Sequence, residues 1–108
     1  MPFEVLNNQI KINRDEILAE LYQSQQHHTA VGIFIKETHE LITTAVTNIE
    51  LNETKSEYVI CLHDQDLHGF PLETTRLLLS DIDKIIRFNV QFDDPQYVKV
   101  RRKEKFKT

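Results

Sequence analysis

Residues 83–92 read DKIIRFNVQF, and this stretch decides the fold class. Successive side chains of a β-strand point to opposite faces of a sheet, so strict alternation of apolar and polar residues indicates a strand with one buried face. The alternating apolar residues are Ile86, Phe88, Val90 and Phe92, and the polar ones between them are Arg87, Asn89 and Gln91. We therefore predict a half-buried strand here.

Four segments before this strand are rich in β-branched and aromatic residues, a composition typical of extended structure. They are TAVGIFIKE (29–37), ELITTAVTNIEL (40–51), EYVICLH (57–63) and ETTRLLLS (73–80). The connections between them are short, whereas parallel neighbours need a crossover of about a dozen residues. The sequence thus predicts five strands, each antiparallel to its neighbours.

A helix is predicted before the strands, over about residues 13–25 of the segment INRDEILAELYQSQQ. Asn13 is suited to be its N-cap, and Glu16 stands three residues later at the reciprocal position of a capping box. The face expected to pack on the rest of the fold carries Ile17, Leu18, Leu21 and Tyr22.

The predicted fold class is mainly β (α+β), with an N-terminal helix followed by a five-stranded antiparallel, strongly bent sheet or small barrel. A flat meander with the helix packed across one face satisfies the same pattern and is the alternative. The chain of 108 residues fits one domain. We assign residues 1–96 to a single small-barrel domain and residues 97–108 to a basic C-terminal tail.

The last two predicted strands meet at a hydrophobic–polar–x–Ile–x–x–Ile arrangement. It is formed by Leu79, Ser80, Asp81, Ile82 and Ile85. With the order of one helix and then five strands, the second of them long, this arrangement resembles the Sm-like or SH3-like small-barrel superfamily over about residues 13–92. The resemblance implies a barrel with the helix at one opening, and edge strands that pair between copies into dimers or rings.

Two departures bear on what the resemblance implies. The family's glycine in the middle of the second strand is replaced by Thr44, Ala45 and Val46. The basic pair that RNA-binding members carry between the last two strands is replaced by SDID at residues 80–83. Aspartates at that point repel a phosphate backbone, so the usual RNA pocket is not expected.

Charge is distributed unevenly along the chain. Residues 1–96 contain seven basic and sixteen acidic residues, a net charge of −9, whereas residues 97–108 contain six basic residues and one acidic residue, a net charge of +5. The basic residues of the tail are Lys99, Arg101, Arg102, Lys103, Lys105 and Lys107. Such a tail can attract phosphate or the acidic body of a neighbouring copy, and it can equally be a solvated terminus.

The stretch CLHDQDLHGF at residues 61–70 is the densest cluster of potential metal ligands. Its candidates are His63, Asp64, Asp66 and His68. Imidazole and carboxylate groups suit zinc, iron, manganese or nickel, although the spacing fits no strong signature. Aspartate and glycine are also what a polar loop uses for local hydrogen bonds, which is the preferred interpretation. His27 and His28 are expected to lie at the helix end in a structural role.

Several threonines are expected on solvent-facing strand positions, or at an edge that another chain could extend by strand addition. They are Thr43, Thr44, Thr47, Thr74 and Thr75.

Three functions remain open at this point. The first is a non-enzymatic interaction module that self-associates or docks a protein partner. The second is an Sm-like nucleic-acid-binding protein that uses the basic tail, and the third is a metal-binding protein that uses the loop at residues 63–68. We expect no enzyme activity and no cofactor, because the chain has no glycine-rich phosphate loop and no nucleophile elbow. A single cysteine and a start without a secretory pattern predict a cytoplasmic location. No apolar run approaches the roughly 18 residues needed to span a bilayer, so we expect no membrane association.

Overall fold

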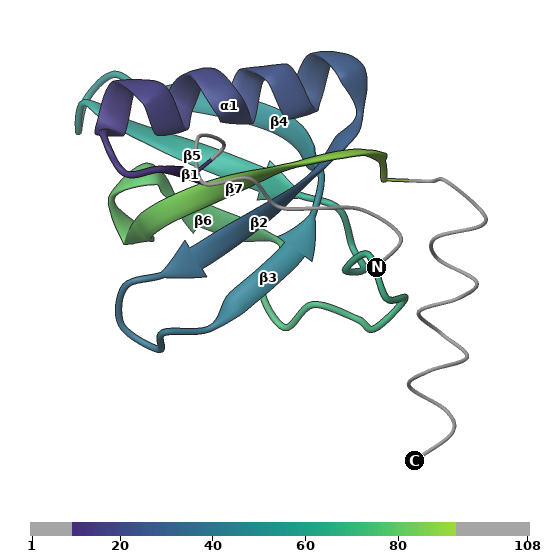
Figure 1. Cartoon of the computed structure of the whole chain (residues 1–108). Coiled ribbons are helices and arrows are strands. Elements are labelled where there is room, and N and C mark those ends of the chain that lie inside the picture. Colours follow the sequence, from purple (N-terminus) through teal and green to yellow (C-terminus); the bar gives the residue numbers. More distant parts are fainter. Residues whose placement is uncertain (1–9, 93–108) are drawn as a thin grey trace.

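A computed structural model describes residues 10–92 of the chain (Figure 1). Its one α-helix, α1 (Arg14–His27), follows a two-residue strand and precedes all the other strands. The remaining elements are β1 (Ile10–Lys11), β2 (Thr29–Ile35), β3 (Leu41–Thr44), β4 (Val46–Asn52), β5 (Glu57–Leu62), β6 (Arg76–Leu78), the 3-10 helix η2 (Leu79–Asp81) and β7 (Ile82–Gln91).

The strands form two sheets, one in the order β1-β7-β2-β3 and one in the order β4-β5-β6. Every strand pair in them is antiparallel. The prediction of a mainly β chain with an N-terminal helix and antiparallel strands is therefore confirmed. A single five-stranded sheet is not what the described residues form, and the two sheets do not close into a barrel.

The division into two sheets comes from a break in the predicted second strand at Ala45. β3 ends at Thr44 and pairs with β2, whereas β4 begins at Val46 and pairs with β5. At the break, the buried hydroxyl of Ser24 on α1 accepts a hydrogen bond from the Val46 N–H at 3.0 Å. The same hydroxyl donates to the Thr29 carbonyl at 2.7 Å. One side chain thus joins α1, β2 and the start of β4.

The predicted fourth strand, residues 73–80, is also shorter than expected. Only Arg76–Leu78 form β6, and the chain then turns through η2 into β7. The carboxylate of Asp81 accepts a hydrogen bond from the Leu78 N–H at 3.2 Å, which stabilises this tight turn. The last predicted strand is confirmed as β7, and Ile86, Phe88 and Phe92 are buried as the alternation indicated.

The predicted start of α1 is confirmed, because the Asn13 side chain accepts a hydrogen bond from the Asp15 N–H at 2.9 Å. Glu16 forms an ion pair with Lys11, with 3.6 Å between nitrogen and oxygen. The helix ends as expected at its two histidines: His27 is the last helical residue, and His28 has a left-handed backbone with a φ of 54°.

The buried face of α1 differs from the prediction. Ile17 and Leu21 are buried as expected, but Tyr22 is 45% exposed. Glu20 and Ser24 are buried instead. Positions 17, 20, 21 and 24 follow the three- and four-residue spacing of one helix face, so the packed face is continuous but partly polar. This face lies against β2, β4 and β7 (Figure 1).

Burial of Glu20 is compensated by Arg87 on β7. The guanidinium donates two hydrogen bonds to the carboxylate, from Nη2 to Oε1 at 2.6 Å and from Nε to Oε2 at 2.7 Å. The Glu20 carboxylate raises the pKa of Arg87 above its usual value, mainly through these hydrogen bonds. The Glu20 side chain is 7% exposed and that of Arg87 45%, so this bidentate pair connects the buried helix face to the surface of β7.

The main apolar core fills the space between α1 and the two sheets. Its buried members are Ile17, Leu21, Val31, Ile33, Val46, Ile60, Leu62, Leu79, Ile82 and Ile85.

Within residues 10–92, no helix is long and apolar enough to cross a membrane.

Replacing Ser24 with alanine should lower the free energy of unfolding by about 1–3 kcal/mol, because the buried Val46 N–H loses its acceptor. Urea unfolding followed by circular dichroism measures the change. Gln26→Ala, at an exposed position of the same helix, is the matched control and should leave the midpoint nearly unchanged. A Ser24→Ala chain as stable as the control would show that this hydrogen bond does not stabilise the fold.

A double-mutant cycle should give a larger coupling for Glu20 and Arg87 than for an exposed ion pair. Arg87→Gln leaves a buried carboxylate without its partner and should cost about 2 kcal/mol, whereas Glu20→Gln combined with Arg87→Gln should cost less than the two single changes added. The control is the pair Glu50 and Arg76, whose side chains are 48% and 60% exposed and whose coupling should stay below about 1 kcal/mol. Equal couplings would contradict the buried-pair interpretation.

Candidate functional site

The candidate site is a groove between the turn that leads into β3 and the loop at residues 63–75 that joins β5 to β6. The groove has a volume of about 400 Å³. Its apolar lining includes Ile35, Ile42, Leu72 and Leu77. Its acidic lining consists of Glu40, Asp66 and Glu73. Side chains from four separate parts of the chain therefore meet around one space.

The loop wall of the groove is held by a compact turn centred on Asp66. The Asp66 carboxylate accepts hydrogen bonds from the backbone N–H groups of His68 at 3.0 Å and Phe70 at 2.9 Å. Gly69 has a φ of 87°, a conformation that a residue with a side chain rarely adopts. The aspartate and the glycine of the sequence are thus used to build the loop.

Two further contacts fasten this loop to the rest of the molecule. The Leu67 side chain is fully buried, and its N–H donates to the Thr43 carbonyl on β3 at 2.6 Å. Near the loop end, the Leu72 N–H donates to the Asp64 carbonyl at 3.1 Å. The wall of the groove is consequently an ordered hairpin-like segment anchored on β3.

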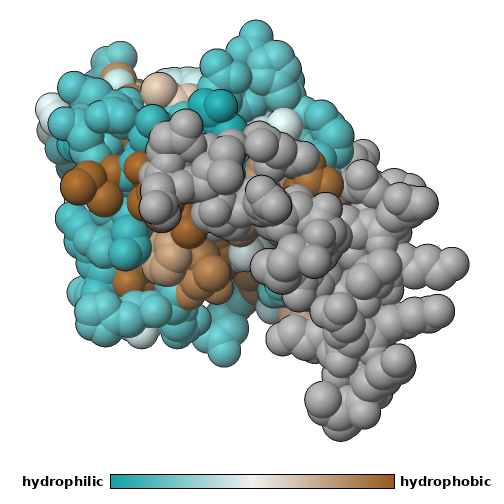
Figure 2. Space-filling view, viewed as in Figure 1, coloured by the Kyte–Doolittle hydropathy of each residue, from teal (hydrophilic) through white to brown (hydrophobic). Residues whose placement is uncertain are grey.

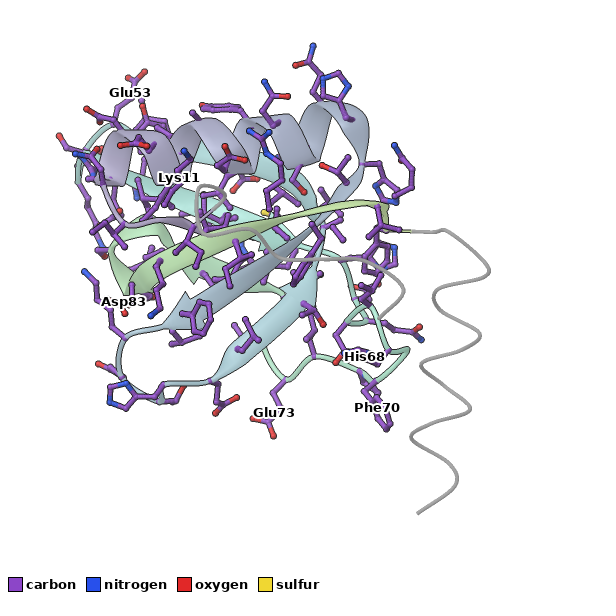
Figure 3. All side chains as sticks on the ribbon, in the orientation of Figure 1. Lys11, Glu53, His68, Phe70, Glu73 and Asp83 are labelled. Atoms are coloured by element: carbon purple, nitrogen blue, oxygen red, sulfur yellow. The ribbon has the colours of Figure 1, made fainter. Side chains whose placement is uncertain are left out.

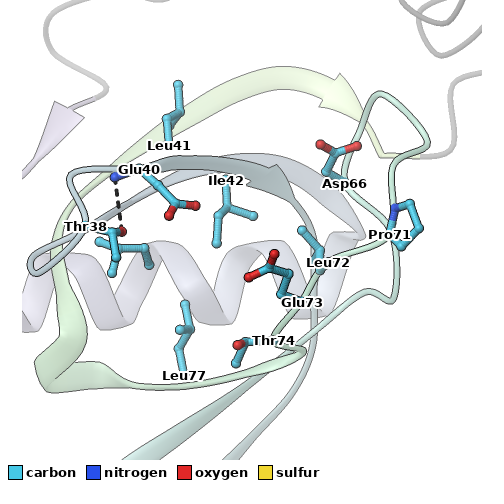
Figure 4. Close-up of a pocket in the computed structure, with 11 residues that line it drawn as sticks. Thr38, Glu40, Leu41, Ile42, Asp66, Pro71, Leu72, Glu73, Thr74 and Leu77 are labelled. Atoms are coloured by element: carbon cyan, nitrogen blue, oxygen red, sulfur yellow. Dashed lines mark hydrogen bonds between the residues drawn. The ribbon is translucent and has the colours of Figure 1, made fainter.

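The carboxylates of Glu40 and Glu73 point into the groove from opposite sides (Figure 4). No residue lining the groove is basic, and among the described residues neither glutamate belongs to an ion pair. Like charges that face each other across a partly apolar space repel, and a cationic group placed between them removes that repulsion. The groove is therefore suited to a positively charged ligand.

One edge of β3 borders the groove. β3 is the outermost strand of its sheet, so only β2 pairs with it among the strands at residues 10–92. On the edge of β3 that faces away from β2, the Thr43 carbonyl accepts a hydrogen bond from the Leu67 N–H of the loop. In an antiparallel strand, the backbone N–H and C=O of successive residues point alternately to the two edges of the strand. Leu41, two residues earlier, therefore presents its N–H and C=O to the same edge, where no described strand pairs with it.

The rim of the groove exposes apolar surface as well. Leu41 is 49% exposed, and it points away from the groove interior (Figure 4). In the space-filling view, apolar side chains lie between polar ones on the face that carries β2 and β3 (Figure 2). Phe70, which is 37% exposed, lies with Glu73 at the end of the molecule opposite to Glu53 (Figure 3).

The four predicted metal-ligand candidates do not converge. The Asp66 carboxylate is engaged by the backbone of its own turn, and the His63 ring packs on Phe92 with 4.4 Å between ring centroids. Asp64 is exposed. Within residues 10–92 there is no group of three or more His, Cys, Asp or Glu side chains arranged to hold a metal ion. This geometry gives the metal hypothesis no support.

The remaining predicted residues divide into those the structure places and those it does not. Thr44 is fully buried, so its predicted exposure was wrong, whereas Thr47 and Thr74 are exposed as expected. The six basic residues of the tail, from Lys99 to Lys107, lie outside the described residues.

The groove itself was not predicted from the sequence. Glu40 and Glu73 lie 33 positions apart in segments interpreted as a turn and a strand end, and neither carries a local pattern that indicates a shared site. Only the return of the loop onto β3 brings them together. Comparison of the chain with protein-family models, with curated proteins and with solved structures finds no match in any of the three.

Asp66 separates a structural role from a metal-binding role. Asp66→Asn keeps the side-chain oxygen that accepts the two backbone hydrogen bonds, whereas Asp66→Ala removes it. We expect the asparagine variant to unfold near the midpoint of the unchanged chain and the alanine variant to lose about 1–2 kcal/mol. Zinc or a chelator should not move the melting temperature of any of the three. Stabilisation by zinc that both variants lose would instead identify Asp66 as a metal ligand.

Proposed function

We propose that the protein is a non-enzymatic interaction module that binds an extended, cationic segment of a protein in the groove beside β3. The observation that carries the proposal is the combination of an apolar lining, three carboxylates without a basic neighbour in the groove, and an open strand edge. Each component matches one property of such a segment.

The open edge of β3 suits a ligand with an extended backbone. A peptide that adds to a sheet edge forms main-chain hydrogen bonds, and its alternate side chains enter pockets beside the edge. Leu41 would supply the main-chain groups, while Ile42, Leu72 and Leu77 would receive apolar side chains. Glu40 and Glu73 would then pair with lysine or arginine side chains of the same segment.

We also propose that the architecture is an open relative of the Sm-like or SH3-like small barrel. The proposal draws on the position of η2 between β6 and β7, on the helix that precedes β2, and on the continuation of β3 into β4 through the single residue Ala45. Barrel closure would require the two sheets to pair with each other. Edge strands left open in this way are also where copies of the chain would associate.

Nucleic-acid binding is the less favoured function. It rests on the tail alone, because residues 10–92 contain thirteen acidic and seven basic residues. The Asp81 carboxylate is used to cap the turn before β7, at the position where RNA-binding relatives of the resembled family carry a basic pair. A strongly acidic surface disfavours contact with a phosphate backbone.

The groove is tested with a nine-residue peptide of alternating valine and lysine, titrated into the full chain labelled with nitrogen-15. We expect chemical-shift changes centred on the amides of Leu41 and Thr43. Glu40→Gln combined with Glu73→Gln should weaken binding about tenfold, which corresponds to about 1.4 kcal/mol for the loss of two partly exposed charge contacts.

The matched control for this titration is Glu53→Gln combined with Glu57→Gln, which removes the same charge outside the groove lining. It should leave peptide affinity close to that of the unchanged chain. Equal weakening by both double variants would show that the peptide responds to net charge, and an absence of shift changes on β3 would contradict the proposed site.

A further inference from the structure

The basic C-terminal tail is chemically complementary to the groove. The groove presents Glu40, Asp66 and Glu73 with no basic neighbour in its lining, while residues 97–108 contain six basic residues and one acidic residue. Opposite charges attract once they come within about 8–10 Å of each other, the screening length at physiological salt. The strongest cationic segment of the chain therefore matches its groove in charge.

The tail also has the residue pattern that an open strand edge selects. Residues 98–101 read Val-Lys-Val-Arg, so apolar and basic residues alternate with the two-residue period of a strand. Paired along β3, Val98 and Val100 would share one face, and Lys99 and Arg101 the other. The face with Lys99 and Arg101 would turn into the groove, where the aliphatic parts of these side chains can lie on the apolar lining while their charged ends reach Glu40 and Glu73.

The end of the described chain lies next to the loop that forms one wall of the groove. Phe92 is buried, its N–H donates to the His28 carbonyl at 3.0 Å, and its ring packs on His63. His63 begins the loop and stands three residues before Asp66 in the groove lining. The five residue steps from Phe92 to Tyr97 can span up to roughly 17 Å, and the segment beyond can extend further.

We propose that residues 97–108 of each chain occupy the groove of that same chain and thereby compete with a partner segment for it. This inference rests on the proposed function of the groove. A tethered segment that can reach its site has an effective concentration in the millimolar range, well above that of other copies at micromolar protein. Binding within one chain is therefore favoured over binding between chains, and a partner must displace the tail.

The first test is zero-length carbodiimide crosslinking of the full chain, which joins a lysine to a carboxylate in direct contact. Equal amounts of unlabelled and nitrogen-15-labelled chains are mixed before crosslinking, and crosslinked peptides are identified by mass spectrometry. We expect crosslinks from tail lysines to Glu40 or Glu73 in which both peptides carry the same label. Glu53, exposed at the opposite end of the molecule, is the internal control and should form few such crosslinks (Figure 3).

Two results would overturn the proposal. Crosslinks to Glu40 and Glu73 that combine labelled with unlabelled peptides would show that the tail of a second copy occupies the groove. Crosslinks spread equally over Glu53 and the groove carboxylates would show that the tail has no preferred site on the acidic surface.

A second test separates this inference from the proposed function. In a full-length variant, all six basic tail residues are replaced by glutamine, and the valine–lysine peptide is titrated into it. We expect about tenfold tighter binding than to the unchanged chain, because the competing tail is weakened. Equal affinity for both chains would refute the tail as occupant while keeping the groove as a binding site. No binding to either chain would refute the function of the groove, and with it the inference.

Discussion

The hydroxyl of Ser24 makes the bend between β3 and β4 possible. Where the chain passes from one sheet to the other at Ala45, the buried N–H of Val46 needs an acceptor outside the strand ladder. A buried donor without an acceptor costs about as much free energy as a lost hydrogen bond. Ser24 accepts from that donor and ties it through the Thr29 carbonyl to β2. α1 is thus more than a cover over the core, because it supplies the polar group that the break requires.

The groove follows from the same break. Since β4, and not β3, continues alongside β5, the outer edge of β3 has no strand partner within residues 10–92. The loop that follows β5 returns to the edge of β3, where it bonds the Thr43 carbonyl. The backbone groups of Leu41 on the same edge have no partner strand within residues 10–92. The return of the loop also brings Glu73 opposite Glu40 (Figure 4). The open strand edge and the acidic lining therefore arise from the same break, which is why we propose a single binding site that uses both.

Much of the candidate site was beyond sequence reasoning for a physical reason. The cluster at residues 61–70 brings several potential metal ligands together in sequence. In the structure, however, the Asp66 carboxylate accepts hydrogen bonds within its own turn, and the His63 ring packs on Phe92. The residues that line the groove form no such cluster in sequence, and they come together only in the folded chain. Proximity in sequence indicates loop geometry more readily than it indicates a site.

The sequence alone determined the helix start at Asn13, the half-buried strand β7, the antiparallel direction of strand pairing and the uneven charge of the chain. These depend on periodicity, capping and composition, which act over a few residues or over the whole chain. Only the tertiary structure decided that Glu20 and Ser24 are buried, because the partners that compensate them, Arg87 and Val46, lie 67 and 22 positions away. Only the tertiary structure, likewise, decided that the strands form two sheets and that one edge of β3 has no strand partner within residues 10–92.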